Sequence, residues 1–181
     1  MVLNYNDVFD FNNKDKINPK FKSENPKSTF NLKNDLFDFK NRMEESDTIK
    51  IWFDHSVSSF QGYERLRILK KSDSLYISSE FKEEKFTNIS EWKVIYTKSI
   101  PVNDTIWKFE DFIRRNVNRL KKNISENDRL ILQIANNNDK IEFHTTGLVD
   151  YNRFLKDYIN TMKELFPGKN YYFHDVDIVE E

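Results

Sequence analysis

The hydrophobic positions of this chain change their period several times, and each period predicts a kind of element. Residues 31–45 show helical spacing, and Asn31 is a candidate N-cap for that helix. Its apolar stripe consists of Leu32, Leu36, Phe39 and Met43. The period then falls to two over residues 48–57, which predicts a strand. One face of this strand carries Ile49, Ile51, Phe53, His55 and Val57, and the other carries Lys50, Trp52, Asp54 and Ser56.

Further segments with a period of two follow. Residues 63–71 and 74–82 flank a turn at Ser72 and Asp73, so they predict a hairpin. The inward positions of this hairpin are Leu66, Ile68, Leu75, Ile77, Ser79 and Phe81. Residues 91–100 predict a fourth strand that Pro101 ends, with Trp92, Val94, Tyr96 and Ile100 aligned on one face.

The second half of the chain alternates between helical and strand patterns. A second helix is expected from residues 103–105 to about Lys122, with a stripe of Ile106, Phe109, Ile113, Val117 and Leu120. Residues 129–135 and 140–146 predict two strands, the first with Leu130, Leu132 and Ile134 on one face. Asp150 is a candidate cap for a third helix, whose stripe is Tyr151, Phe154, Leu155, Tyr158, Met162 and Leu165. Residues 171–179 predict a last strand.

These elements predict one α+β domain over residues 31–181, in the order α-β-β-β-β-α-β-β-α-β. Because the connections between strands are short, we expect a mostly antiparallel sheet of about six to seven strands with three helices. Residues 1–30 predict an N-terminal arm or tether that is partly disordered, since Pro19 and Pro26 interrupt any regular element.

Composition narrows the chemistry that the chain can carry. Its 181 residues include 16 Phe but no Cys and only three Gly, and Ala135 is the single Ala. The aromatic residues favour a globular domain, because each buried ring removes a large apolar area from water. The missing residues exclude a thiol nucleophile, a Cys-based metal site and a Gly-rich phosphate loop. We therefore expect a protein that is not an enzyme and that uses no cofactor or metal ion.

Charge and hydropathy bear on partners and location. The 29 basic and 30 acidic side chains give a net charge of −1, so no overall charge steers the chain to nucleic acid. No apolar run is long enough to span a membrane, and the first residues lack the pattern of a signal peptide. We expect a cytoplasmic protein. The alternative is a periplasmic or lipid-anchored protein whose signal was removed, with residues 1–30 as its tether.

The three histidines are the candidates for proton transfer or metal binding. Asp54 and His55 are neighbours on a strand and point to opposite faces, so they cannot act as a side-by-side pair. An enzyme hypothesis would need His55 or His144 as a general base in a pocket beside a carboxylate. His174 precedes Asp175 and Asp177, which together make an incomplete site for a hard cation.

Two groups of residues are candidates for binding. Residues 114–122 form the basic half of the second helix, and Arg115, Arg119 and Lys122 share one face of it. Such a face can bind phosphates or an acidic partner surface. Trp52 and Asp54 lie on the face of the first strand opposite Ile51, where Trp52 is a partner anchor if exposed and a core residue if covered.

In composition and size the chain is similar to small α+β proteins of AT-rich bacteria and their phages, among them immunity proteins and inhibitors. That likeness implies a non-enzymatic module that neutralises another protein, for example a toxin or effector, by binding it. The alternative function is nucleic-acid binding through the basic helix 114–122. A second alternative is an exported or lipid-anchored domain of unknown ligand.

Overall fold

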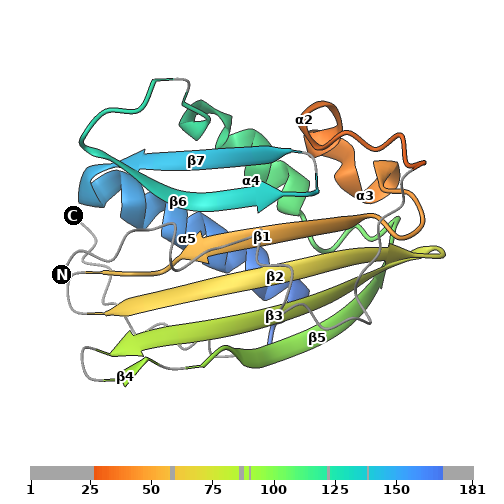
Figure 1. Cartoon of the computed structure of the whole chain (residues 1–181), viewed down its shortest axis with the longest axis horizontal. Coiled ribbons are helices and arrows are strands. Elements are labelled where there is room, and N and C mark those ends of the chain that lie inside the picture. The colour runs from red at the N-terminus through yellow and green to blue at the C-terminus, as the bar shows by residue number, and fades with distance from the viewer. Residues whose placement is uncertain are drawn as a thin grey trace.

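An antiparallel sheet with helices behind one face organises the chain (Figure 1). The computed structural model describes residues 27–57, 60–85, 88–89, 91–121, 123–137 and 139–168. The strands are β1 Thr48–Asp54, β2 Gln61–Lys71, β3 Ser74–Lys85, β4 Asn88–Ile89, β5 Lys93–Pro101, β6 Asp128–Ala135 and β7 Lys140–Thr146. The helices are α2 Leu32–Asp35, η3 Leu36–Asp38, α3 Phe39–Arg42, α4 Phe109–Arg115, η4 Val117–Arg119 and α5 Gly147–Leu165. The predicted α+β class, with an antiparallel sheet and three helical regions, is confirmed.

The sheet is built from hairpins except at its centre. Its order is β4-β3-β2-β1-β6-β7, and β5 also pairs with β3, alongside the rest of that strand. The β1–β2 register sets Ile51 opposite Leu66 and Phe53 opposite Glu64. The central strand β1 also pairs with β6, where Ile51 lies opposite Ile134. Residues from the two halves of the chain therefore meet in the middle of the sheet.

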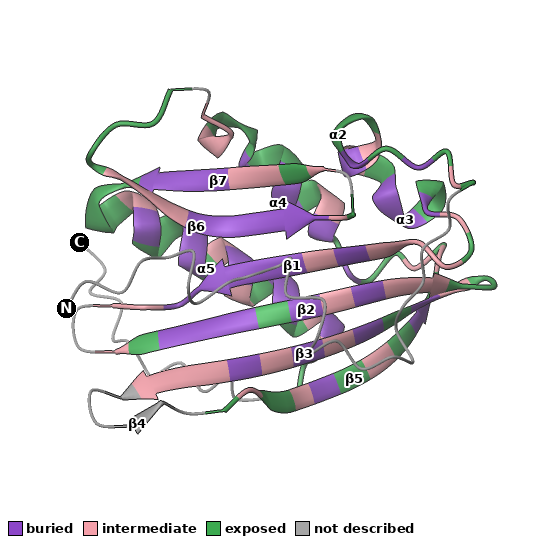
Figure 2. Ribbon diagram, in the orientation of Figure 1, coloured by how far each residue is buried: buried purple, intermediate pink, exposed green. Residues whose placement is uncertain are grey.

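The core lies between the sheet and α4 and α5, and Figure 2 shows the buried residues gathered there. Phe53 of β1 stacks on Tyr158 of α5, with ring centroids 3.8 Å apart, and on Phe154 at 6.0 Å. Phe112 of α4 contacts both of these α5 rings. Burying an aromatic side chain of this kind stabilises the fold by about 1.5–3 kcal/mol. The stripe predicted for the third helix is fully buried, as expected.

The first helical region differs from the predicted continuous helix over residues 31–45. It breaks into α2, η3 and α3, because the backbone N–H of Lys40 donates to the Glu110 carboxylate at 3.0 Å instead of continuing the helical ladder. The Lys40 ammonium is buried as well, and it donates to the carbonyl oxygens of Asp104 and Trp107, each at 2.9 Å. A contact with a distant segment thus outweighs local helix propensity here.

The second helix is shorter than predicted at both ends. It begins at Phe109, because the Asp104 carboxylate accepts from the backbone N–H of Trp107 and closes a turn before it. It ends at Arg115, after which the Asn116 side chain donates to the carbonyl of Phe112. Ile106 and Val117, two residues of the predicted stripe, are consequently exposed.

Strand irregularities explain the remaining differences among the described residues. A bulge opposite Ser79 and Glu80 leaves Val94 exposed instead of inward, and a bulge in β6 buries Ile131. The third helix begins at Gly147 and not at Asp150, and Gly147 has the positive φ of 73° that its turn requires. The predicted last strand 171–179 lies outside the described residues, as does the predicted arm apart from residues 27–30, of which Phe30 joins the core.

Candidate functional site

Helix α5 presents three different surfaces around its axis. Its apolar stripe faces the sheet and is buried. Its three acidic residues, Asp150, Asp157 and Glu164, repeat every seven residues and therefore share one flank, beside α4. Its three basic residues, Arg153, Lys156 and Lys163, are all exposed on the remaining side. We call these the buried stripe, the acidic flank and the basic stripe of α5.

Each residue of the acidic flank bonds to the segment that contains α4 and η4. Asp150 accepts from Arg119 at 2.5 Å, and Asp157 accepts from Arg115 at 2.8 Å. Glu164 accepts from the backbone N–H of Lys108 at 2.9 Å, at the beginning of α4. The contacts run in opposite chain directions, so they hold two antiparallel helical segments in register.

The acidic flank pairs with arginines of the predicted basic helix 114–122. Arg115 and Arg119 pair with the acidic flank, and the hydrogen bond to Asp157 raises the pKa of Arg115 above its usual value. Arg114 pairs with Asp111, and Lys121 pairs with Asp128. Lys122 lies outside the described residues. The described cations of the segment 114–122 are therefore matched by carboxylates of the chain itself.

The basic stripe of α5 is different. Arg153, Lys156 and Lys163 have no hydrogen bond or ion pair to any residue that the structure describes. The first turn of α5 continues the same exposed side with Val149, which is 65 % exposed, and the neighbouring Leu148 is 72 % exposed. The sequence predictions did not include these residues. A signal for them existed in the helical spacing, which places the three bases opposite the apolar stripe.

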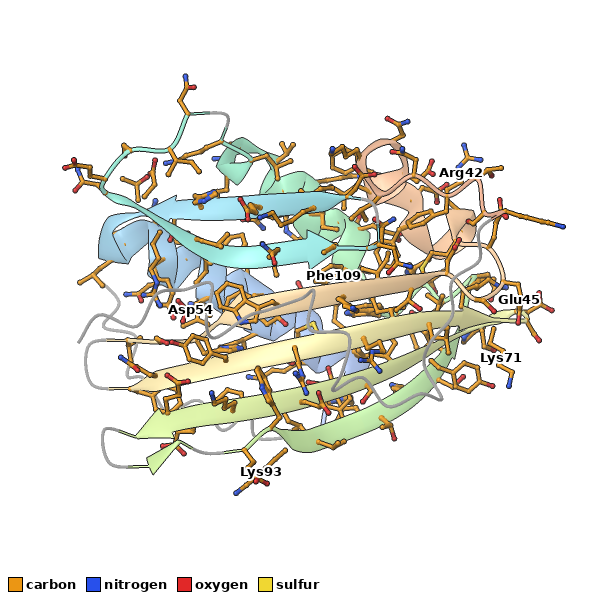
Figure 3. All side chains as sticks on the ribbon, viewed as in Figure 1. Arg42, Glu45, Asp54, Lys71, Lys93 and Phe109 are labelled. Carbon is orange, nitrogen blue, oxygen red and sulfur yellow. The ribbon has the colours of Figure 1, made fainter. Side chains whose placement is uncertain are left out.

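Trp52 and Asp54 are both buried. Trp52 lies on the sheet face away from α4 and α5, where it is 2 % exposed and stacks on Tyr63 with ring centroids 6.0 Å apart. Asp54 lies at the end of β1, as Figure 3 shows, and its carboxylate accepts from Arg129 at 2.5 Å and from the backbone N–H of Ser56 at 2.9 Å. Arg129 also lies over the ring of Tyr151 in α5. Of the two alternatives for Trp52, an exposed partner anchor or a covered core residue, the structure shows the covered residue.

A polar cluster lies inside the core next to these residues. The Glu64 carboxylate lies 3.0 Å from His55 Nε2 and accepts from the Tyr158 hydroxyl at 3.0 Å and the Ser79 hydroxyl at 2.8 Å. All four side chains are buried; His55 directly follows β1, and the other three come from β2, β3 and α5. Burial lowers the pKa of His55, although the bond to Glu64 opposes this shift. Asp54 and His55 have separate partners, as their alternation on the strand predicts.

His144 of β7 is also buried, and burial lowers its pKa. The enzyme hypothesis required a histidine in a pocket beside a carboxylate. His55 has the carboxylate, but it is packed among the rings of Phe53, Phe81 and Tyr158. His174, Asp175 and Asp177 lie outside the described residues.

The remaining observations concern metal binding, membranes and similarity to known proteins. Within the described ranges, no group of three or more His, Asp or Glu side chains is arranged to hold a metal ion. No described helix is both long and apolar enough to cross a membrane. Comparisons with models of protein families, with curated proteins and with solved structures gave no match for this chain.

Proposed function

We infer that this chain is a non-enzymatic protein-binding module of the immunity or inhibitor type, which neutralises a partner protein by direct contact. The observation that carries this proposal is a set of exposed aliphatic side chains at one end of the molecule. They are Leu148, Val149, Ile124 and Val117, with exposed fractions of 72 %, 65 %, 58 % and 47 %. We call this set the α5 corner.

The α5 corner draws on three segments that polar contacts tie together. Arg119 bonds to Asp150, and Lys121 bonds to Thr146 at 2.5 Å. Each residue of the corner lies within three positions of one of these bonded residues. Single exposed aliphatic residues are ordinary, but several from converging segments are typical of a protein–protein contact.

The same contacts favour binding by holding the corner in place before a partner arrives. A surface that is already ordered loses less conformational entropy on association than a mobile one. Asp128 adds to this order, because it accepts from both Lys121 and Thr146, and these bonds hold its pKa well below the usual range. The α5 corner therefore combines exposed apolar side chains with segments that are held in place by hydrogen bonds and ion pairs.

The proposal is tested by site-specific cross-linking in the cells from which the chain comes. A photo-reactive amino acid replaces Leu148 in one variant and Ile106 in another, followed by mass spectrometry of the products. Ile106 is a matched control, since it is 67 % exposed but lies next to the Lys108–Glu164 contact, at the far end of α5. At about 1.5 Å per residue, that contact is about 24 Å along the helix from Leu148.

We expect one dominant protein product at Leu148 and none of it at Ile106. The product of the neighbouring gene is the first candidate to examine. Co-purification of that protein with the wild-type chain should be lost in the double variant Leu148→Lys, Val149→Lys and kept in Ile106→Lys. Equal products at both positions, or retained co-purification in the double variant, would count against the α5 corner as a binding surface.

A further inference from the structure

The charged residues of α5 divide into two groups of equal size. All three acids are bonded to the α4 segment, and none of the three bases is bonded to a described residue. The acids therefore form ion pairs and hydrogen bonds with the α4 segment and not with the bases of the same helix. The exposed side of α5 keeps three positive charges.

The three bases share one side of the helix with Val149, a residue of the α5 corner. Val149 precedes Arg153 by four residues, Lys156 follows three residues later, and Lys163 lies two turns beyond, so all of them share one side of the helix. From Val149 to Lys163 this surface extends for about 21 Å at 1.5 Å per residue. It is apolar at one end and basic along the rest.

We propose that the basic stripe of α5 docks an acidic segment of the partner protein, which lies along the helix while its apolar side chains contact the α5 corner. This inference rests on the proposed function, because it names the partner chemistry of the same surface. Complementary charge accelerates association and selects among partners. The partner segment needs carboxylates spread over about 15 Å, the rise from Arg153 to Lys163, which matches a helix of roughly 10 residues.

The structure favours an acidic protein over the other anions that a basic helix can meet. A helix that binds a membrane surface inserts a wide apolar face, but the apolar stripe of α5 is buried against the sheet. A nucleic-acid site gains from many phosphate contacts, whereas the clustered cations of the segment before β6 are already paired within the chain.

The test uses the full-length chain and a fluorescent 20-residue helical peptide with Glu and Leu on one face. Binding is followed by stopped-flow and equilibrium anisotropy at 50 and 300 mM NaCl. The double variant Arg153→Glu, Lys156→Glu is compared with Lys71→Glu, Lys93→Glu, which changes the net charge equally. Figure 3 labels both control lysines, at the end of β2 and the beginning of β5, where they are exposed and form no ion pair or hydrogen bond with a described residue.

We expect the α5 double variant to associate at least about tenfold more slowly than wild type at 50 mM salt, and the control variant to stay within about twofold. Raising the salt should weaken wild type far more than the α5 variant, because screening removes the same interaction. Equal binding by the two double variants would overturn the inference, as would no binding of the peptide by wild type.

Two further probes separate this inference from its competitors. Vesicles containing phosphatidylserine and a 20-nucleotide single-stranded DNA replace the peptide in parallel assays. Tighter binding of either probe than of the peptide, lost in the α5 variant, would assign the stripe to a lipid or nucleic-acid surface and overturn the inference. If cross-linking at Leu148 identifies a partner whose binding ignores the α5 charge reversal, the proposed function stands and only the acidic docking fails.

Discussion

The inner and outer sides of α5 treat polar groups in opposite ways. On the inner side, the Tyr158 hydroxyl reaches a buried carboxylate of β2 that has two further neighbours within hydrogen-bonding distance. On the outer side, Arg153 and Lys156 extend into solvent with no described partner. Buried polar groups are stable only when they are bonded, whereas exposed ones need no partner from their own chain. We therefore expect substitutions on the inner side to change the stability of the fold. Substitutions on the outer side should leave folding intact and test the proposed binding.

The largest effect on folding is expected from removal of the buried Glu64 carboxylate. Glu64→Ala leaves three buried polar side chains without their shared acceptor and opens a cavity, so we expect a loss of about 3–5 kcal/mol in the free energy of unfolding. Urea denaturation followed by circular dichroism measures this loss. Glu64→Gln keeps an acceptor oxygen and should lose less. A Glu64→Ala protein within about 1 kcal/mol of wild type would remove the distinction between the two sides.

The buried histidines should make the stability of the fold depend on pH. Because burial lowers the pKa of His55 and His144 below the ordinary value, the unfolded chain binds more protons than the folded chain just below pH 6.5. The contribution of the two neutral histidines to the free energy of unfolding is therefore fully present above pH 6.5, and it is lost as the pH falls below this value. Urea midpoints at pH 7.5, 6.5 and 5.5 measure the slope. Substituting Gln for His55 should flatten it, and an unchanged slope would mean that His55 does not take part.

The acidic flank is less buried than Glu64 and more buried than the basic stripe. Its removal should therefore lower the free energy of unfolding by an intermediate amount. Asp157→Ala removes the partner of Arg115 and an acceptor for Asn116, so we expect a loss of about 1 kcal/mol. Asp157→Asn keeps one acceptor oxygen for Asn116 and is the matched control, with a smaller loss. Thermal and urea unfolding of both variants would decide the order. A larger loss for Asp157→Asn than for Asp157→Ala would contradict this account of the flank.

The outer side should tolerate substitution almost without effect on folding. Lys156→Glu is expected to change the free energy of unfolding by no more than about 0.5 kcal/mol, since the ammonium has no described partner to lose. The same urea titration measures it beside wild type. A loss comparable to that of Asp157→Ala would show that the basic stripe contributes to folding, contrary to the proposed division of roles.

The sequence predicted the inner side of α5 better than its outer side. The apolar spacing that ends at Leu165 was sufficient, because a helix stripe of this regularity has to face a core. The partner of His55 could not be predicted, since it depends on the register that sets Phe53 opposite Glu64 and on the loop between the two strands. Local sequence patterns predict whether a segment is a helix or a strand, but they do not predict which strand it pairs with or in which register.

The ion-pair partners of the basic cluster 114–122 could not be predicted from local sequence either. Arg115 and Arg119 formed the most prominent cation group in the sequence, yet their acids come from residues more than 30 positions later. The bounds of α4 were mistaken for a related reason, because Asp104 and Asn116 bond to the backbone at its two ends. Side chains that can compete for backbone groups make the ends of a helix harder to predict than its middle.

The central position of β1 has a consequence for how the chain is made. Strand β1 finds β2 as soon as the first hairpin emerges from the ribosome, but its other edge must wait for β6, whose Ala135 pairs with Lys50. Until then, a strand with a largely apolar face has a row of unbonded backbone groups, which is a template for pairing with other chains. Contacts of such long sequence separation also form slowly. Until residue 135 has left the ribosome, the edge of this central strand therefore stays open to pairing with other chains.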